Sequence, residues 1–382
     1  MMKLKFISAL IGAATLISCG PQYVKPVEAS EVGFAVEFFK NVNAVEPGTS
    51  NVVVSPYSAA VAFSMLAEGA QGQTRVELDN ALGGVLYKAS DLGSNDTVVV
   101  KSANSLWLDD NFSPRNRYVN LLEKEFDAFV DVENFASPVA VKAINNWCSE
   151  HTNGKIPEII KELSPGNLMV LINALYFNAP WENEFNPYMT MKQPFYGLSK
   201  ESQVDMMGVK GSYKYAEYQG FQMIRLPYKG QTYSMYVILP PADMDINKII
   251  SNMDASVYRA ALDKLSMQEV RFFMPRFKLE TSMVLNKTLQ QMGVKSAFSQ
   301  AADFGGIAEM GQLSVGLVQQ KCFIEVTEKG TEAAAVTSIM IRGTSVRPPK
   351  VLPIMRVDRP FVFVIADENN QNILFAGKIV NL

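Results

Sequence analysis

One stretch near the carboxyl end constrains the fold of this 382-residue chain more than any other: residues 325–345, EVTEKGTEAAAVTSIMIRGTS. Gly330 provides a hinge, because glycine tolerates unusual backbone angles. Most of the residues that follow it are small or β-branched, and none is proline before residue 348. In a strand, every second residue shares a face, so one face would carry only Thr331, Ala333, Ala335 and Thr337. The stretch therefore predicts a loop that can become a strand without burying a charge.

A flexible linker rich in alanine and threonine is the alternative interpretation, since alanine is a poor strand former. The segment that follows argues against it. Residues 359–381 contain two apolar runs separated by a polar turn, which is typical of a β-hairpin. A stretch followed by core strands is a loop within one domain.

The first residues have the pattern of an export signal and not of a folded element. A basic start, Met1 to Lys5, precedes an apolar run over residues 6–17 that is too short to span a membrane comfortably. Ser18 directly before Cys19 resembles the bacterial lipoprotein cleavage box. We expect residues 1–18 to be a lipoprotein signal peptide, Cys19 to be the lipidated first residue, and residues 19–30 to be a tether. The alternative is a plain secretory signal with an incidental cysteine.

This interpretation predicts an exported protein, lipid-anchored to the bacterial cell envelope on its periplasmic or cell-surface side. On this interpretation the lipid anchor, and not an excess of charge, attaches the protein to the membrane. The chain has 35 basic and 38 acidic residues and a net charge of −3, so no excess of either sign indicates nucleic acid as a partner. About 350 residues remain after the tether, and no linker divides them, which favours one domain over residues 31–382.

The other two cysteines are too few for a disulfide framework, and we expect both to be free and mostly buried. Cys148 and His151, the single histidine, are three residues apart and can share a helix face. A thiol–imidazole pair of this kind can serve as a nucleophile or as a fragment of a metal site. No second histidine exists to complete a metal site. We therefore expect a structural role, no metal, no cofactor and no enzymatic activity.

Periodicity and end signals divide the chain into helices and strands that alternate irregularly, as in an α+β domain. Ser30 is a plausible cap for the first helix, and Asn153-Gly154 is a good left-handed stop for the fifth. Residues 168–177 are nearly all apolar, as in a central strand buried on both faces. The expected helices cover residues 29–41, 58–67, 74–82, 114–125, 138–151 and 281–293. The expected strands cover residues 51–54, 105–108, 130–135, 168–177 and 315–326, with a hairpin over residues 223–226 and 233–239.

Several long blocks of the sequence resemble the serpin family. The hinge stretch and the closing run RPFVFVIADENNQNILFAGKIVNL resemble the family's reactive-loop hinge and carboxyl-terminal signature. The resemblance implies an α+β serpin fold with a large central, mainly antiparallel β-sheet, further sheets, a helical bundle and an exposed reactive-centre loop at about residues 328–350. The blocks that carry the resemblance are residues 51–83, 145–160, 171–185, 274–307, 328–338 and 359–382.

The resemblance also assigns roles within the loop. The hinge corresponds to Glu328, Lys329, Gly330, Thr331, Glu332, Ala333, Ala334 and Ala335. Counting the family's hinge-to-bait distance from Glu328 places the scissile bond at Thr344-Ser345, which favours an elastase-like target with a small-residue pocket. Arg342-Gly343 is the alternative, a tryptic bond.

Two further groups of residues match the family's pattern around the main sheet. Ser55, Ser58, Asn173 and Gln320 match the polar cluster beneath the strands that part during loop insertion, where glutamine replaces the family's usual histidine and cannot titrate. Helix capping is the alternative role of the two serines. Trp181, Arg276 and Glu328 match the region where the loop first enters the sheet, and simple core packing is the alternative for the tryptophan.

The function implied is a suicide-substrate inhibitor of serine proteases, and by extension of cysteine proteases, that acts as a monomer. Loop insertion in serpins is a known case of stored strain released by cleavage, and the resemblance implies the same mechanism for this chain. A non-inhibitory serpin acting as a surface binding or carrier protein is the competing hypothesis. Its hinge would carry bulky, charged or proline residues where this chain has small ones.

Overall fold

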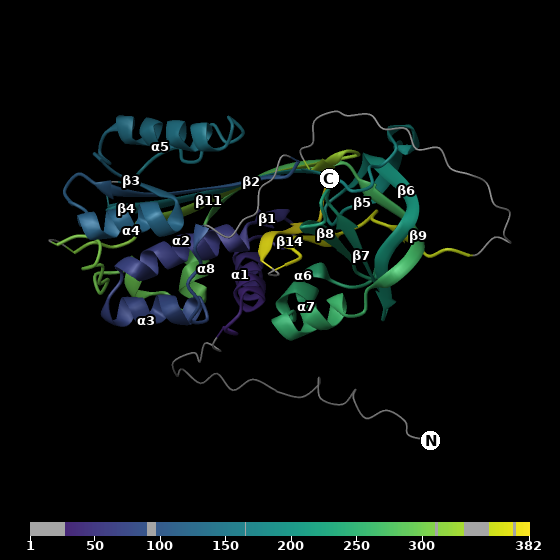
Figure 1. Cartoon of the computed structure of the whole chain (residues 1–382), viewed down its shortest axis with the longest axis horizontal. Helices are drawn as coiled ribbons and strands as arrows, with labels where there is room; N and C mark the ends of the chain where they lie inside the picture. Colours follow the sequence, from purple (N-terminus) through teal and green to yellow (C-terminus); the bar gives the residue numbers. More distant parts are fainter. Residues whose placement is uncertain (1–26, 90–96, 165, 310–311, 332–350, 370–371) are drawn as a thin grey trace, which may run out of the picture.

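The computed structural model describes residues 27–89, 97–164, 166–309, 312–331, 351–369 and 372–382. Within these residues, most helices lie on the left of the view in Figure 1, and two large sheets make up most of the rest. No helix in the described ranges is long and apolar enough to cross a membrane. The signal peptide, Cys19 and most of the tether lie outside them.

The helices begin where the sequence provides caps. The Ser30 side chain accepts a hydrogen bond from the Gly33 amide and starts α1, and Ser55 does the same for Ser58 at the start of α2. Nearly every residue of α2 is buried, which explains its run of small apolar side chains. The helices are α1 (Glu31–Val45), α2 (Pro56–Gly69), α3 (Gly72–Ala81), α4 (Asn116–Phe126), α5 (Pro138–His151), α6 (Ile246–Ser251), α7 (Ala255–Leu262) and α8 (Asn286–Gln291), with 3-10 turns η2 (Pro187–Met189) and η3 (Ser296–Phe298).

A sheet of six described strands carries the hinge, in the order β10-β11-β12-β4-β2-β3. It is mixed: β2 runs parallel to β3 and β4 parallel to β11, whereas the other pairings are antiparallel. Its strands are β10 (Phe277–Val284), β11 (Leu317–Thr327), β12 (Gly330–Thr331), β4 (Met169–Pro180), β2 (Val99–Asp109) and β3 (Ala128–Glu133).

A sheet of nine described strands forms the other half and contains the predicted hairpins. β7 pairs with β8 and β14 with β15, both antiparallel. The strands in order are β1 (Val52–Val54), β15 (Ile373–Ile379), β14 (Phe361–Asp367), β8 (Tyr233–Leu239), β7 (Phe221–Pro227), β6 (Glu201–Tyr218), β9 (Ser266–Pro275) and β13 (Ile354–Arg356), with β5 (Met191–Tyr196) paired to β6.

The six-stranded sheet is covered on both faces. Figure 1 shows α5 on one face and α2 and α4 on the other. A small apolar cluster joins α5 and the residues after it to β2 and β4, while a much larger cluster lies among α1, α2 and the other helices. Both faces of β4 are therefore buried, as predicted from its nearly all-apolar run.

One expected helix was wrong. Residues 281–284 belong to β10, and α8 covers only Asn286–Gln291. Pairing with β11 from Thr281↔Cys322 to Val284↔Gln319 supplies the backbone bonds that a helical turn would have made, so tertiary pairing overrides local propensity. The predicted stop after α5 is confirmed, because Asn153 and Gly154 have φ of 54° and 72°.

Candidate functional site

The hinge already forms a short strand. Gly330 and Thr331 constitute β12, which lies between β11 and β4 and pairs antiparallel with both. A Cβ atom on Gly330, whose φ is +156°, would lie 2.2 Å from the Ala179 carbonyl oxygen and 2.5 Å from the Pro180 Cα atom. Glycine is required here because two backbones approach too closely for a side chain.

Thr331 is held by a buried hydroxyl pair. Its Oγ1 atom lies 2.6 Å from the Tyr228 hydroxyl, and both residues are at most 1% exposed. Tyr228 stacks on Trp181 with ring centroids 4.5 Å apart. Burial raises the pKa of Tyr228 well above its usual range, so the hydroxyl stays neutral and able to donate. No local pattern in the sequence marks Tyr228, which lies in a predicted turn.

Trp181 contacts the hinge by hydrogen bonds as well as packing. Its Nε1 atom donates to the Thr327 carbonyl at 2.9 Å, and its amide donates to the Lys329 carbonyl at 2.8 Å. The turn between β11 and β12 is thus fixed from the side. Core packing, the alternative for Trp181, is also observed, since the residue is 1% exposed.

Glu328 is anchored on the same side. Arg276 donates to its Oε1 atom at 2.5 Å and Thr190 at 2.7 Å. Burial alone would raise the pKa of Glu328, but the hydrogen bonds from Arg276 and Thr190 outweigh it and lower that pKa. The carboxylate therefore stays charged. The structure brings together all three residues assigned to this region: Trp181, Arg276 and Glu328.

Further along β4 and β11 from the hinge, three amide side chains form a row across neighbouring strands. Asn104, Asn173 and Gln320 are cross-strand partners on β2, β4 and β11. Asn173 Nδ2 donates to Asn104 Oδ1 at 2.6 Å, and Gln320 Nε2 donates to Asn173 Oδ1 at 2.8 Å. Each residue is 1% exposed. Asn104 was missed from the sequence, because only the register of β2 against β4 places it beside Asn173.

The two serines join this row through their backbones. Gln320 bonds to the Ser55 amide at 2.9 Å and to the Ser55 carbonyl at 3.0 Å, and Asn173 donates to the Ser58 carbonyl at 3.0 Å. The Ser55 side chain caps α2, so the capping alternative is correct for that hydroxyl. The Ser58 hydroxyl is buried with no hydrogen-bond partner among the described residues. The predicted cluster is therefore assembled, with backbone groups where side chains were expected.

The hydrogen bonds of this cluster fall into two groups, one on each side of the boundary between β4 and β11. Asn173 is bonded to Asn104 and Ser58 on the β4 side, whereas Gln320 is bonded to Ser55 on the β11 side. The Gln320–Asn173 bond connects the two sides. Between them run the parallel pairs from Leu317↔Val170 to Cys322↔Leu175. We call this boundary between β4 and β11 the parting line.

Cys148 and His151 do not form a reactive pair. Cys148 is fully buried, and burial raises its pKa to about 12, which disfavours the thiolate. His151 Nδ1 donates to the Trp147 carbonyl at 2.7 Å, and the ring stacks on Trp147. Cys148 and Cys322 are both free and buried, as expected.

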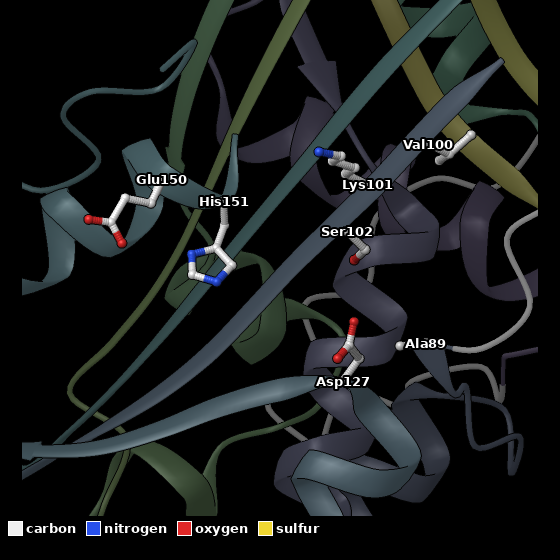
Figure 2. A pocket seen from close by; sticks show the side chains of 7 residues that line it. All are labelled: Ala89, Val100, Lys101, Ser102, Asp127, Glu150 and His151. Carbon is white, nitrogen blue, oxygen red and sulfur yellow. The ribbon is translucent and has the colours of Figure 1, made fainter. Parts of the chain in front are cut away.

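A surface hollow of about 480 Å³ lies beside the His151 ring, between the end of α5, the start of β2 and the left-handed residue after α4 (Figure 2). Its β2 residues, Val100 to Ser102, pair with β4 only two to four positions before Ala179, the partner of Thr331. Figure 2 shows charged groups that do not converge on a nucleophile. Among the residues with described positions, no group of three or more histidine, cysteine or carboxylate side chains is arranged to hold a metal ion.

The predicted bait positions, Thr344-Ser345 and Arg342-Gly343, lie outside the described residues, as do the hinge residues Glu332, Ala333, Ala334 and Ala335. Glu328, Lys329, Gly330 and Thr331 lie within them.

Comparison with known proteins gives one family. A family model described as serpin (serine protease inhibitor) matches residues 29–382. An uncharacterized serpin-like protein of Thermococcus kodakarensis is 32% identical, with 94% of this chain and 86% of that protein covered. Iripin-2 of Ixodes ricinus is 33% identical over 87% of this chain and 88% of its own length.

Solved structures agree. The native state of tengpin, a thermophilic serpin, has a TM-score of 0.86 and 28% identity, covering 93% of this chain and 94% of that one. Human thyroxine-binding globulin complexed with thyroxine has a TM-score of 0.83 and 25% identity, covering 92% of this chain and 97% of that one. The assembled hinge, the amide row and these matches over nearly the whole domain lead to one conclusion: the chain belongs to the serpin family.

Proposed function

We propose that this serpin is a suicide-substrate inhibitor that traps a protease by inserting its cleaved loop along the parting line. The hydroxyl of a serine protease attacks the carbonyl carbon of the bait residue and forms an ester, and the amine of the next residue leaves. Cysteine proteases form the equivalent thioester, so they are a second target class. The inserting loop then carries the acyl-enzyme away before water hydrolyses the bond.

The observation that carries this proposal is the register of β12. Thr331 is opposite Val326 of β11 and Ala179 of β4. The residue six positions after Thr331 in the loop is Thr337. The residue six positions before Val326 on β11 is Gln320, and the residue six positions before Ala179 on β4 is Asn173. The parallel register of the two strands independently pairs Gln320 with Asn173. A continued β12 therefore fits both neighbours at once and delivers Thr337 to the amide row.

Insertion has a physical driving force. The added strand would pair antiparallel with both neighbours and replace the parallel contact between them, and antiparallel pairing is slightly more stable per residue. Backbone groups of the inserted segment would gain ladder bonds on both sides, and the inward set from Thr331 to Thr337 is small and uncharged. The hydroxyl of Thr337 can replace the direct Gln320–Asn173 bond, so no buried amide is left without a partner.

The competing function is a surface binding or carrier protein. Thyroxine-binding globulin shares the fold and carries a small molecule. The hinge distinguishes the two proposals, since a carrier does not need Gly330 at a close backbone contact followed by residues that fit a continued strand.

The test is a Thr331→Arg variant beside a Thr331→Val control. Arginine at a site that is 1% exposed would carry an unpaired charge into the sheet, so the loop should be cut but not inserted. Wild type and the valine variant, mixed with an elastase-like or a trypsin-like protease, should give complexes that survive denaturing gels. The released peptide should begin at Ser345, or at Gly343 if Arg342 is the bait. Undiminished trapping by the arginine variant would refute insertion.

We also propose that the mature chain is lipid-anchored through Cys19 to the bacterial envelope, where it would protect against external proteases. The support is the sequence alone: the basic start, the short apolar run and Ser18 before Cys19. Labelled fatty acid should enter the wild type and not a Cys19→Ala variant. Equal labelling would refute the anchor.

A further inference from the structure

The structure fixes the point at which the tether leaves the domain. Arg259 of α7 donates to the Glu28 carboxylate at 2.6 Å and to the Ser30 hydroxyl at 2.9 Å, and this hydroxyl donates to Glu28 at 2.9 Å. On the other side the chain approaches Gly83, where φ is +67° and a Cβ atom would lie 2.8 Å from the Glu28 carbonyl oxygen. Residues 28–30 are therefore held between α7 and the turn after α3.

The exposed surface of α3 and of the turn after it carries no charge. The charged residues of this helix are partly buried and bonded within the domain, Arg75 to Asp79 at 2.8 Å and Glu77 to the Ser296 amide at 2.7 Å. The exposed residues from the start of α3 onward are Gly72, Gln73, Val76, Asn80, Gly84 and Leu86.

α7 has the same property. Its exposed residues are Ser256, Val257 and Ala260, and its Arg259 is paired with Glu28. By contrast, α4 and α5 each expose both basic and acidic residues. Figure 1 shows α3 and α7 along the lower edge of the molecule and α5 along the upper edge. We call the exposed residues of α3, of the turn after it and of α7 the anchor-side surface.

The tether is too short to let another side of the domain reach a membrane. From Cys19 to Glu28 the chain spans at most about 32 Å, at about 3.3–3.6 Å per residue. A domain of about 350 residues has a radius of gyration of about 20 Å and is therefore about 50 Å across. When the acyl chains on Cys19 lie in a bilayer, a tether of this length cannot pass around the domain. The anchor-side surface then stays nearest the lipid.

The two described ends of the reactive-centre loop lie elsewhere. Thr331 belongs to β12 in the six-stranded sheet, and Val351 precedes β13, which pairs with β9 at the right of the view in Figure 1. Trp181 and Met355, beside these two ends, belong to one apolar cluster, whereas Val27, at the end of the tether, packs against another. The anchor point and the loop therefore belong to different halves of the domain.

We propose that the anchor-side surface lies against the headgroups of the bilayer that carries the anchor, and that the reactive-centre loop is thereby presented to the water. The inference rests on the proposed lipid anchor at Cys19 and assigns the surface that the anchor brings to the membrane. It also makes soluble proteases, and not proteases of the same bilayer, the targets that the loop reaches most readily.

The tether, and not the surface alone, holds this orientation. An uncharged surface has no basic cluster to attract anionic headgroups and no acidic cluster to be repelled by them. Its large apolar side chains, Val76, Leu86 and Val257, are single exposed residues of a kind found on most soluble domains. A short tether compensates, because it keeps the surface at a high local concentration beside the lipid.

The test measures how close single positions lie to the bilayer in the full, lipidated chain. The two cysteines that the structure describes are free but buried, so a thiol-reactive dye should label only an introduced cysteine. Val76→Cys and Val257→Cys place the dye on the anchor-side surface. Val139→Cys on α5 is the matched control, since the three valines are 50%, 52% and 60% exposed. The proteins are bound to phosphatidylcholine vesicles that contain an acceptor-labelled lipid, and energy transfer is measured.

Energy transfer from positions 76 and 257 should be higher than from position 139 by about threefold or more, because the domain is about 50 Å across. Val351→Cys, at an end of the loop that is 95% exposed, should behave like Val139→Cys. A flexible insert of about 24 glycine and serine residues between Gly20 and Pro21 adds up to about 80 Å of reach and should reduce the difference by about half or more.

Equal transfer from all four positions on these protein-free vesicles would overturn the inference and leave the uncharged surface to a protein partner. A difference that the insert does not reduce would also overturn it, because the tether would not be what sets the orientation. Failure of the anchor looks different: the wild type would take up no labelled fatty acid and would stay in solution, which refutes the anchor and this inference together. Trapping of a protease in solution would be unaffected in each of these cases.

Discussion

Removing the Tyr228 hydroxyl tests whether β12 is held in the sheet by its contact with Thr331. In a Tyr228→Phe variant, Thr331 Oγ1 would stay buried without the partner that now lies at 2.6 Å. An unsatisfied buried hydroxyl costs about 1–3 kcal/mol, so the opening equilibrium of β12 should rise about 5-fold to 150-fold. The stacking of the ring on Trp181 would be kept, because phenylalanine retains the ring.

The assay is hydrogen exchange of a peptide that covers residues 328–331, read in a double-mutant cycle. Thr331→Val alone would leave the Tyr228 hydroxyl buried without its partner, so it should raise the opening equilibrium of β12 by a similar factor. The double variant replaces both partners by apolar groups of similar shape, which is close to neutral. A coupling free energy of about 1 kcal/mol or more is therefore expected. Additive effects, or unchanged exchange in Tyr228→Phe, would show that this contact does not hold β12.

Three other perturbations follow from the same geometry. Asn173→Leu should lower the free energy of unfolding by about 3 kcal/mol in urea, because it removes bonds to Ser58, Asn104 and Gln320, and a loss under about 1 kcal/mol would contradict the amide row. Gly330→Ala should expose residues 328–331 to exchange, whereas Gly166→Ala, where a Cβ meets nothing within 4 Å, should not. Burial lowers the pKa of Lys378 to about 8, so the folded state loses this proton at a lower pH than the unfolded state does. The wild type should therefore gain stability between about pH 8 and pH 10 relative to Lys378→Met. Parallel plots of unfolding free energy against pH for the two proteins would refute this.

The parts of the site that depend on local pattern were predictable from the sequence. Small residues after Gly330, the apolar run of β4 and the cap at Ser30 each follow from one rule about backbone or burial. Tyr228 and Asn104 could not be found this way. Their roles depend on which strands become neighbours and in what register. Tyr228 is 103 positions from its partner Thr331, and Asn104 is 69 positions from its partner Asn173.

The same reasoning explains why residues 281–284 form a strand and not a helix. Thr281 and Val284 have no local signal strong enough to decide, and pairing with β11 decides for them. β11 is also the strand that carries Gln320, Lys321 and the hinge. Two neighbouring side chains of β11 are bonded on opposite faces of the sheet: the Gln320 amide donates to Asn173, and the Lys321 ammonium donates to the Glu158 carbonyl. Under the proposed insertion, a strand that continues β12 would have to replace the Gln320–Asn173 bond, because the registers of β11 and β4 place both residues six positions from the partners of Thr331.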